Sequence, residues 1–155
     1  MKRSELQTRL ESLDYDMYLS LLLHRPMAVS KSHRLIEQWD KRMARKLIGR
    51  NFHRPCHSAN RVKYWAAAEE TDRGHRHYHL LLSFPSDEMK DKFILHLDEM
   101  WAQTIKGGTA SIDSLGPFDD GDRSRMVNYD LKELPTTESG HIDTSYQTYS
   151  KAFSL

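Results

Sequence analysis

The sequence predicts an α+β domain, in which a central antiparallel β-sheet has helices packed on one of its faces. Two observations lead to this class. Runs of strand length at residues 16–25, 62–70 and 75–84 are rich in apolar residues, and a turn-forming "TDRG" joins the last two. Longer stretches beside these runs have apolar residues at the spacing of one helix face.

The first part of the chain predicts a strand followed by a long helix. Residues 16–25, "DMYLSLLLHR", indicate a short buried strand. Residues 30–50 indicate a helix, because leucine, tryptophan and methionine recur there at helical spacing. We expect Ser30 or Ser32 to cap the start of this helix and Gly49 to end it.

The rest of the chain predicts a hairpin, two helices and one more strand. Residues 62–70 and 75–84 are expected to pair as an antiparallel hairpin. The order of all the elements is close to the split βαβ arrangement of ferredoxin-like domains. The elements after the hairpin are a helix opened by Pro85 and Ser86 that runs to about Ile105, a strand over residues 109–115 and a helix over residues 122–134.

Length and composition indicate one soluble domain. The chain has 155 residues, of which we assign 1–134 to the domain and 135–155 to a polar, loosely ordered C-terminal tail. The sequence contains no GxxxxGK[ST] or GxGxxG motif, which argues against nucleotide binding. Short apolar runs predict no membrane span. The charged N-terminus and the single cysteine favour a cytoplasmic protein, in a bacterium or a host cell.

Charge is distributed unevenly along the chain. Residues 1–63 contain 14 Lys and Arg against 6 Asp and Glu, a net charge of +8. Residues 64–155 contain 9 against 16, a net charge of −7, so the two parts sum to +1. A basic first half would suit contacts with phosphates, and an acidic second half would suit cations. Charge alone does not separate this interpretation from chance clustering of solvated side chains.

The stretch "GHRHYHLLLSF" contains three histidines within five positions. Because side chains alternate across a strand, His75, His77 and His79 share one face, and the apolar residues from Tyr78 onward share the other. The apolar face should pack against the helices, which leaves the histidine face uncovered. Exposed, half-solvated histidines would explain the pattern, but the adjacent rings of His77 and His79 can also bind one metal ion.

A metal ion between these rings needs a third ligand from the neighbouring strand. Glu69 lies eight residues before His77, across the predicted hairpin. Since Glu69 and Glu70 face opposite sides of their strand, only one of them should join the histidines. Two imidazoles and one carboxylate leave coordination positions open, and such a set suits Mg²⁺ or Mn²⁺ on phosphate oxygens. We expect His75 to be a solvated neighbour.

These residues resemble the core of a known enzyme family. Glu69, a turn that contains glycine, and then His77-Tyr78-His79 are similar to the HUH endonucleases, in which two histidines flank a hydrophobic residue. The pattern is most like that of rolling-circle replication initiators, the Rep proteins. Residues 18–23, "YLSLLL", resemble the first strand motif of that family. The resemblance implies a ferredoxin-like, RRM-like fold, with Glu69, His77 and His79 as ligands of Mn²⁺ or Mg²⁺.

The same resemblance implies a nucleophilic tyrosine on a later helix, with a lysine one turn further on. "MVNYDLKEL", residues 126–134, contains Tyr129 and Lys132 at a spacing that places both on one helix face. The implied reaction is sequence-specific nicking and rejoining of single-stranded DNA through a 5′-phosphotyrosine, with Lys132 stabilising phenolate or phosphate charge. Such an enzyme would initiate rolling-circle replication of a plasmid, phage or satellite element, or would nick a competitor's origin.

The implied partner is single-stranded DNA at an origin or hairpin nick site, and a host helicase and polymerase are further candidates. We expect a monomer or a weak oligomer. Each basic residue alone can also be an ordinary solvated charge. The candidates for DNA contacts, through phosphates or through base stacking on the tryptophan, are Arg42, Arg45, Lys46, Arg61, Lys63, Trp65, Arg73 and Arg76.

Three alternatives stay open. Single-tyrosine transposases of insertion sequences are similar in length and in the paired histidines, but their third ligand tends to be an amide on the tyrosine helix. Glu69 and Lys132 therefore favour the Rep type. Outside the family, two histidines and one carboxylate are typical of non-haem iron enzymes, whose carboxylate usually follows the first histidine closely or follows the pair. A nucleic-acid-binding module without enzymatic activity would leave the combination of ligands and Tyr129 unexplained.

Overall fold

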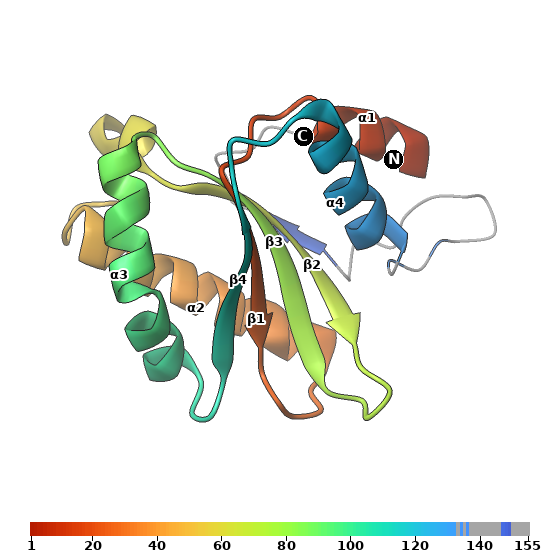
Figure 1. Cartoon of the computed structure of the whole chain (residues 1–155). Coiled ribbons are helices and arrows are strands. Elements are labelled where there is room, and N and C mark those ends of the chain that lie inside the picture. The colour runs from red at the N-terminus through yellow and green to blue at the C-terminus, as the bar shows by residue number, and fades with distance from the viewer. Residues whose placement is uncertain (133, 135, 137–146, 150–155) are drawn as a thin grey trace.

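The computed structural model describes residues 1–132, 134, 136 and 147–149. A five-stranded sheet of order β4-β1-β3-β2-β5 forms its centre, and every neighbouring pair of strands is antiparallel (Figure 1). The elements are α1 (Arg3–Glu11), β1 (Met17–Leu22), α2 (Val29–Leu47), η1 (Pro55–Asn60), β2 (Lys63–Glu70), β3 (Arg76–Ser83), α3 (Asp87–Thr104), β4 (Thr109–Leu115), α4 (Asp120–Lys132) and β5 (Gln147–Tyr149).

The predicted fold class is confirmed, and the predicted strands and helices are present close to their predicted bounds. Local sequence signals explain several of these ends. Gly49 follows α2 with φ +116, a left-handed conformation that favours glycine. The hydroxyl of Ser86 accepts the backbone N–H of Met89 at 3.2 Å and caps α3. Strand β1 ends before the expected residue 25, because the chain leaves the extended conformation at His24, where φ is 55.

The predicted serine cap of α2 is wrong. The helix begins at Val29, after Ala28, and no side chain caps it. Ser32 instead lies buried inside the first turn, where its hydroxyl bonds the carbonyl of Val29 at 2.8 Å and the hydroxyl of Tyr78 at 2.6 Å. A polar side chain that is buried needs such partners, so Ser32 connects α2 to β3 rather than ending the helix.

Helices cover both faces of the sheet, so the expectation of helices on one face is wrong (Figure 1). Helices α2 and α3 pack on one face, where Trp39 and Trp101 meet Tyr78 and Leu80 of β3 in the larger core cluster. Helices α1 and α4 pack on the other face in a second cluster. Its sheet residues include Trp65 and two others, Ala67 and Leu81.

The second face is apolar at one end and polar at the other. Leu81 lies on the same face of β3 as His77 and His79, since side chains alternate, but it is fully buried under the second helical layer. This apolar end would face water without a cover, which is the physical reason for the second layer. Helix α1 was not predicted, because its buried residues are only Leu6 and Leu10, and the residues around them are mostly charged or polar.

Part of the predicted loose tail is ordered. Residues 147–149 form β5, which pairs antiparallel with the outer edge of β2 at Trp65–Ala67. An unpaired strand edge leaves backbone N–H and C=O groups without partners, and added strands commonly satisfy them. The polar sequence of this segment lacks the alternation that would have predicted a strand. The rest of the tail, apart from residue 136, lies outside the described residues.

Candidate metal centre

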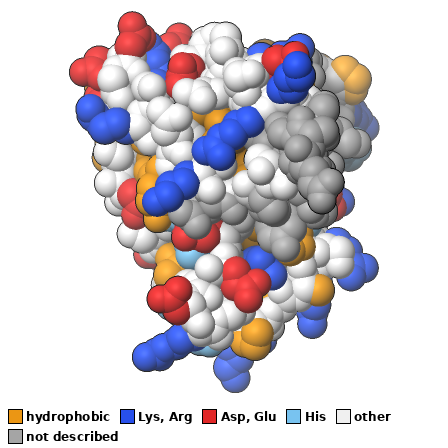
Figure 2. Space-filling view, turned by 90° about the vertical axis from the view of Figure 1, so that its right-hand side faces the viewer, with side chains coloured by type: hydrophobic (Ala, Val, Ile, Leu, Met, Phe, Trp, Pro, Cys, Tyr) orange, Lys and Arg blue, Asp and Glu red, His pale blue; other side chains and the backbone are white. Residues whose placement is uncertain are grey.

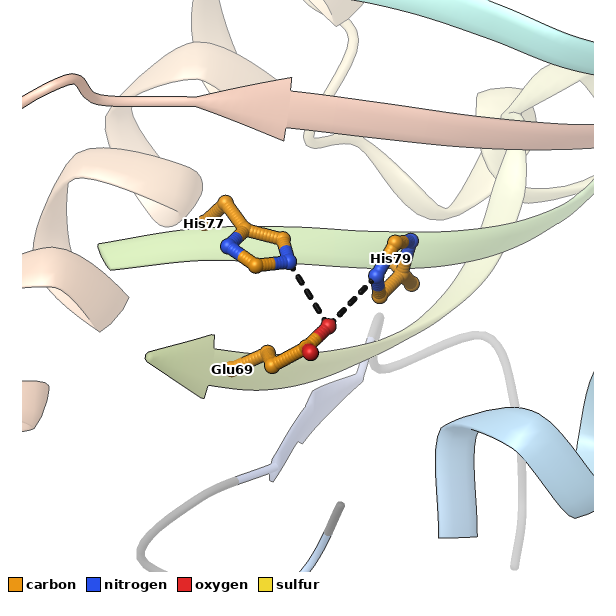
Figure 3. Close-up of side chains that lie close together, drawn as sticks. All are labelled: Glu69, His77 and His79. Atoms are coloured by element: carbon orange, nitrogen blue, oxygen red, sulfur yellow. Dashed lines mark hydrogen bonds and ion pairs between the residues drawn. The ribbon is translucent and has the colours of Figure 1, made fainter. Parts of the chain in front are cut away.

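The hairpin of β2 and β3 brings Glu69, His77 and His79 together. Glu69 is paired directly with His77, and His79 is paired with Ala67, two residues further back on β2. One carboxylate oxygen, Oε2 of Glu69, lies 2.7 Å from Nε2 of His77 and 2.7 Å from Nε2 of His79 (Figure 3). The two imidazole rings are perpendicular, with centroids 5.0 Å apart. Three potential ligand atoms therefore converge on one point.

Side chains alternate between the two faces of β2, and this decides which glutamate lies beside the histidines. Glu70 points to the other face, where its carboxylate lies 3.1 Å from the guanidinium of Arg76. His75 precedes β3, and its backbone N–H donates to the side chain of Thr71. Among the described residues, Glu69, His77 and His79 form a group whose ligand atoms all lie within 4.8 Å of one another. The predicted set is thus brought together, and its role as a ligand set stays a prediction.

The chemistry of these donors suits a divalent cation. The three side chains are 12–17% exposed, so they are shielded but not sealed from solvent. Burial lowers the pKa of His79, although its hydrogen bond to Glu69 acts in the opposite direction. A neutral imidazole is the form that binds a metal ion. His77 Nδ1 is buried without a hydrogen-bond partner in the described part of the chain.

Helix α4 places Tyr129 beside this group. The ring of Tyr129 packs edge-on against the ring of His79, with centroids 5.3 Å apart and an interplanar angle of 87°. Tyr129 is 46% exposed, while its neighbours Met126, Val127 and Leu131 are buried in the second core cluster. The predicted nucleophile therefore lies on the open side of a helix that is anchored to the apolar end of the sheet.

A buried hydrogen bond fixes the same helix at Asp130. The hydroxyl of Tyr18 donates to Oδ1 of Asp130 at 2.6 Å, and Asp130 is 1% exposed. The ring of Tyr18 also stacks on His79, with centroids 5.6 Å apart. Burial raises the pKa of Asp130 to about 8, the Tyr18 hydrogen bond opposes this shift, and the charges of Glu69 and Asp113 add to it. Tyr18 thus contacts both the histidine and the tyrosine helix.

Lys132 is exposed at the last residue of α4, three positions after Tyr129. This spacing places the two side chains on one side of the helix, as predicted.

Four residues near the candidate site were not predicted from the sequence: Ser20, Asp113, Tyr18 and Asp130. Alternation could have placed Tyr18 and Ser20 on one face of their strand, but only the fold shows that this face carries His79.

Two of the predicted DNA contacts are wrong. Trp65 is on the same side of β2 as Glu69, as expected, but it is fully buried under the second helical layer and cannot stack on a base. Arg76 is only 6% exposed, donates to the carbonyl of Met27 at 3.2 Å and pairs with Glu70. Its charge is used inside the protein, because a buried guanidinium requires hydrogen-bond partners.

The other predicted DNA contacts occupy separate parts of the surface. Arg61 pairs with Asp40 at 2.9 Å and lies over the ring of Phe52. Lys63 and Arg73 are exposed, at the start of β2 and in the turn after it. On the side shown in Figure 2, the described basic side chains are interrupted by acidic and uncharged ones. A groove between α2 and α3 is lined by Arg42, Arg45 and Lys46. These two helices cover one face of the sheet, and Glu69, His77 and His79 lie on the other face.

Comparisons with known proteins give no relative: no protein-family model, no curated protein and no solved structure matches the chain. In the part of the chain that the structure describes, no helix combines the length and the apolar character that a membrane span requires.

Proposed function

We propose that this protein is a metal-dependent endonuclease that nicks and rejoins single-stranded DNA through Tyr129, as the resemblance to Rep-type HUH enzymes implies. The observation that carries the proposal is the convergence of Glu69, His77 and His79 on one point, with the exposed ring of Tyr129 against His79. A metal ligand set alone would fit many enzymes. A tyrosine presented from a separate helix at its edge favours a nucleophilic mechanism.

Glu69, His77 and His79 would hold Mn²⁺ or Mg²⁺ through one carboxylate oxygen and two Nε2 atoms. The bound ion would supply charge that polarises a phosphoryl group. Oε2 of Glu69 lies 2.7 Å from Nε2 of His77 and 2.7 Å from Nε2 of His79, and a divalent cation held by these three atoms would neutralise the negative charge of the carboxylate. The donor set therefore fits a cation of this class.

The residues of the chain would carry the strand cleavage. The phenolic oxygen of Tyr129 attacks the scissile phosphorus, loses its proton, and forms a 5′-phosphotyrosine ester. The bond from phosphorus to the 3′ oxygen breaks, and that oxygen takes up a proton to become a free 3′-hydroxyl. Lys132 stabilises negative charge on the phenolate or the phosphate. Attack of a 3′-hydroxyl on the ester reverses these steps and rejoins the strand, so no external energy source is required.

This reaction suits initiation of rolling-circle replication by a plasmid, phage or satellite element, or nicking of a competitor's origin. Single-stranded DNA at an origin or hairpin is the proposed substrate, in the cytoplasm of a bacterium or host cell, and a host helicase and polymerase would extend the nick. Glu69 as the carboxylate ligand favours this role over that of an insertion-sequence transposase, whose third ligand is usually an amide of the tyrosine helix.

Adduct formation tests the proposal. The full chain is incubated with Mn²⁺ and a library of single-stranded oligonucleotides, and covalent protein–DNA products are separated on a denaturing gel. Tyr129→Phe is expected to abolish the adduct, and chelation is expected to prevent it. The double variant Tyr146→Phe/Tyr149→Phe, which removes tyrosines of the tail, should form the adduct normally. An adduct that survives in Tyr129→Phe excludes this nucleophile, and a library without any adduct contradicts the nicking activity.

A further inference from the structure

Each ring nitrogen of His79 has an oxygen within hydrogen-bond distance, and the two oxygens compete for the single N–H of the neutral ring. On one side, Nε2 lies 2.7 Å from Oε2 of Glu69. On the other, Nδ1 lies 3.0 Å from the hydroxyl oxygen of Ser20. A neutral imidazole has one N–H and one lone pair, so it donates to only one of these two oxygens. The partner that wins decides whether Nε2 carries a proton or a lone pair.

Asp113 settles the direction of the Ser20 hydrogen bond. The hydroxyl of Ser20 donates to Oδ2 of Asp113 in a short hydrogen bond. A hydroxyl has a single proton, so the oxygen of Ser20 is then left to accept from Nδ1 of His79. The proton of the neutral ring is held on Nδ1, and the lone pair on Nε2 faces Glu69 and the proposed cation.

A strand irregularity places Asp113 for this role. Strand β4 pairs with β1 through Ile112↔Leu19 and then Ser114↔Tyr18, so the register shifts and Asp113 is the extra residue between these pairs. Bulges of this kind re-aim a side chain and are frequent beside functional sites. The carboxylate of Asp113 also accepts from the hydroxyl of Ser111 at 3.3 Å, while Ser20 itself is 7% exposed.

We propose that Asp113 and Ser20 are positioning residues, which hold the proton of His79 on Nδ1 so that the Nε2 lone pair is available to a divalent cation. The proposal rests on the metal centre of the proposed function. His77 has no comparable arrangement, because its Nδ1 is buried without a hydrogen-bond partner among the described residues. Partners of this kind commonly fix the ring tautomer of a ligand and raise its affinity for the metal.

The position of the proton can be measured without metal or substrate. Two-bond proton–nitrogen NMR spectra of the full chain, recorded metal-free at about pH 8, above the ordinary histidine pKa, distinguish Nδ1–H from Nε2–H rings. His79 is expected to be protonated at Nδ1 in the wild type. In Ser20→Ala, Glu69 is the remaining hydrogen-bond partner of the His79 ring among the described residues, so the proton should move to Nε2. The resonances of His77 serve as an internal reference.

A second variant separates a relay from a simple contact. Asp113 does not need to touch His79, yet Asp113→Ala frees the Ser20 hydroxyl to donate to Nδ1, so this variant should also move the proton to Nε2. Mn²⁺ affinity should fall about 10- to 100-fold in both variants. Ser111→Ala is the matched control: it removes a hydrogen bond from the same carboxylate and should change neither the His79 spectrum nor the affinity.

The outcomes are distinct. If Ser20→Ala leaves the proton of His79 on the same nitrogen as in the wild type, the relay is refuted. If Ser20→Ala moves it and Asp113→Ala does not, Asp113 is not part of the relay. A wild-type protein that binds no Mn²⁺ refutes the metal centre and the proposed function, and it does so independently of the NMR result.

Discussion

The buried carboxyl of Asp130 should make the stability of the protein fall as pH rises. Burial raises the pKa of Asp130 to about 8 from the ordinary value of 3.8. Below the ordinary value, the group is protonated in both the folded and the unfolded chain. At a pH between these two pKa values, the unfolded chain releases the proton while the folded chain retains it. Each unit of pH in this range therefore lowers the free energy of unfolding by about 1.4 kcal/mol. Once the pH exceeds the folded pKa of about 8, the free energy of unfolding falls no further from this group.

Asp130→Asn isolates this effect, because the amide cannot titrate but still accepts the hydroxyl of Tyr18. Its free energy of unfolding, minus that of the wild type, should increase by about 3 kcal/mol between about pH 5 and pH 7. Urea unfolding at several pH values measures the difference, and other groups that titrate in this range, such as Asp40, cancel. Asp98→Asn, an exposed substitution on α3 that also replaces one carboxylate by an amide, is the matched control. Parallel curves for Asp130→Asn and the wild type would refute the reasoning.

Three further predictions concern the site and its surroundings. Saturating Mn²⁺, at about 100 times its Kd, should stabilise the wild type by about 2.7 kcal/mol, measured as a rise in Tm, and should not stabilise Glu69→Ala; an equal rise in both would place the ion elsewhere. The triple variant Arg42→Ala/Arg45→Ala/Lys46→Ala should form the Tyr129 adduct on a short oligonucleotide as fast as the wild type, because these residues lie behind the opposite face of the sheet. Trp65→Ala should lower the free energy of unfolding by about 3–5 kcal/mol, as loss of a buried aromatic does; urea unfolding checks this, and weaker DNA binding at unchanged stability would show that the ring is accessible.

The candidate ligand set could be predicted because it depends on short-range geometry. A hairpin with a brief turn fixes the register of its two strands, and alternation then decides which side chains share a face. Glu69, His77 and His79 lie within 11 residues of sequence, and the structure places them as this reasoning requires. Local rules were equally sufficient for the cap at Ser86 and the helix end at Gly49.

The predictions that were wrong or missing concern residues that are surrounded by distant parts of the chain. By alternation, Trp65 lies on the same face of β2 as Glu69 of the candidate metal centre. Its burial depends on α1 and α4, which begin some sixty residues before it and fifty-five residues after it. The link from Ser20 to Asp113 spans 93 positions and requires a register shift in β4. Neither the packing of a distant helix nor a bulge leaves a signal in the local pattern of apolar and polar residues.

The division of one sheet face into an apolar and a polar end connects stability to the proposed chemistry. Helix α4 is held by Val127 and Leu131 over the apolar end, and this docking sets where Tyr129 lies. The histidines occupy the end that the helix leaves open, so the same packing that hides Leu81 brings the phenol against His79. A substitution that loosens α4 should therefore separate the proposed nucleophile from the candidate metal centre without altering any of the three candidate ligands. Activity would then be lost while Mn²⁺ affinity is retained, a combination that neither unfolding of the sheet nor loss of a ligand would produce.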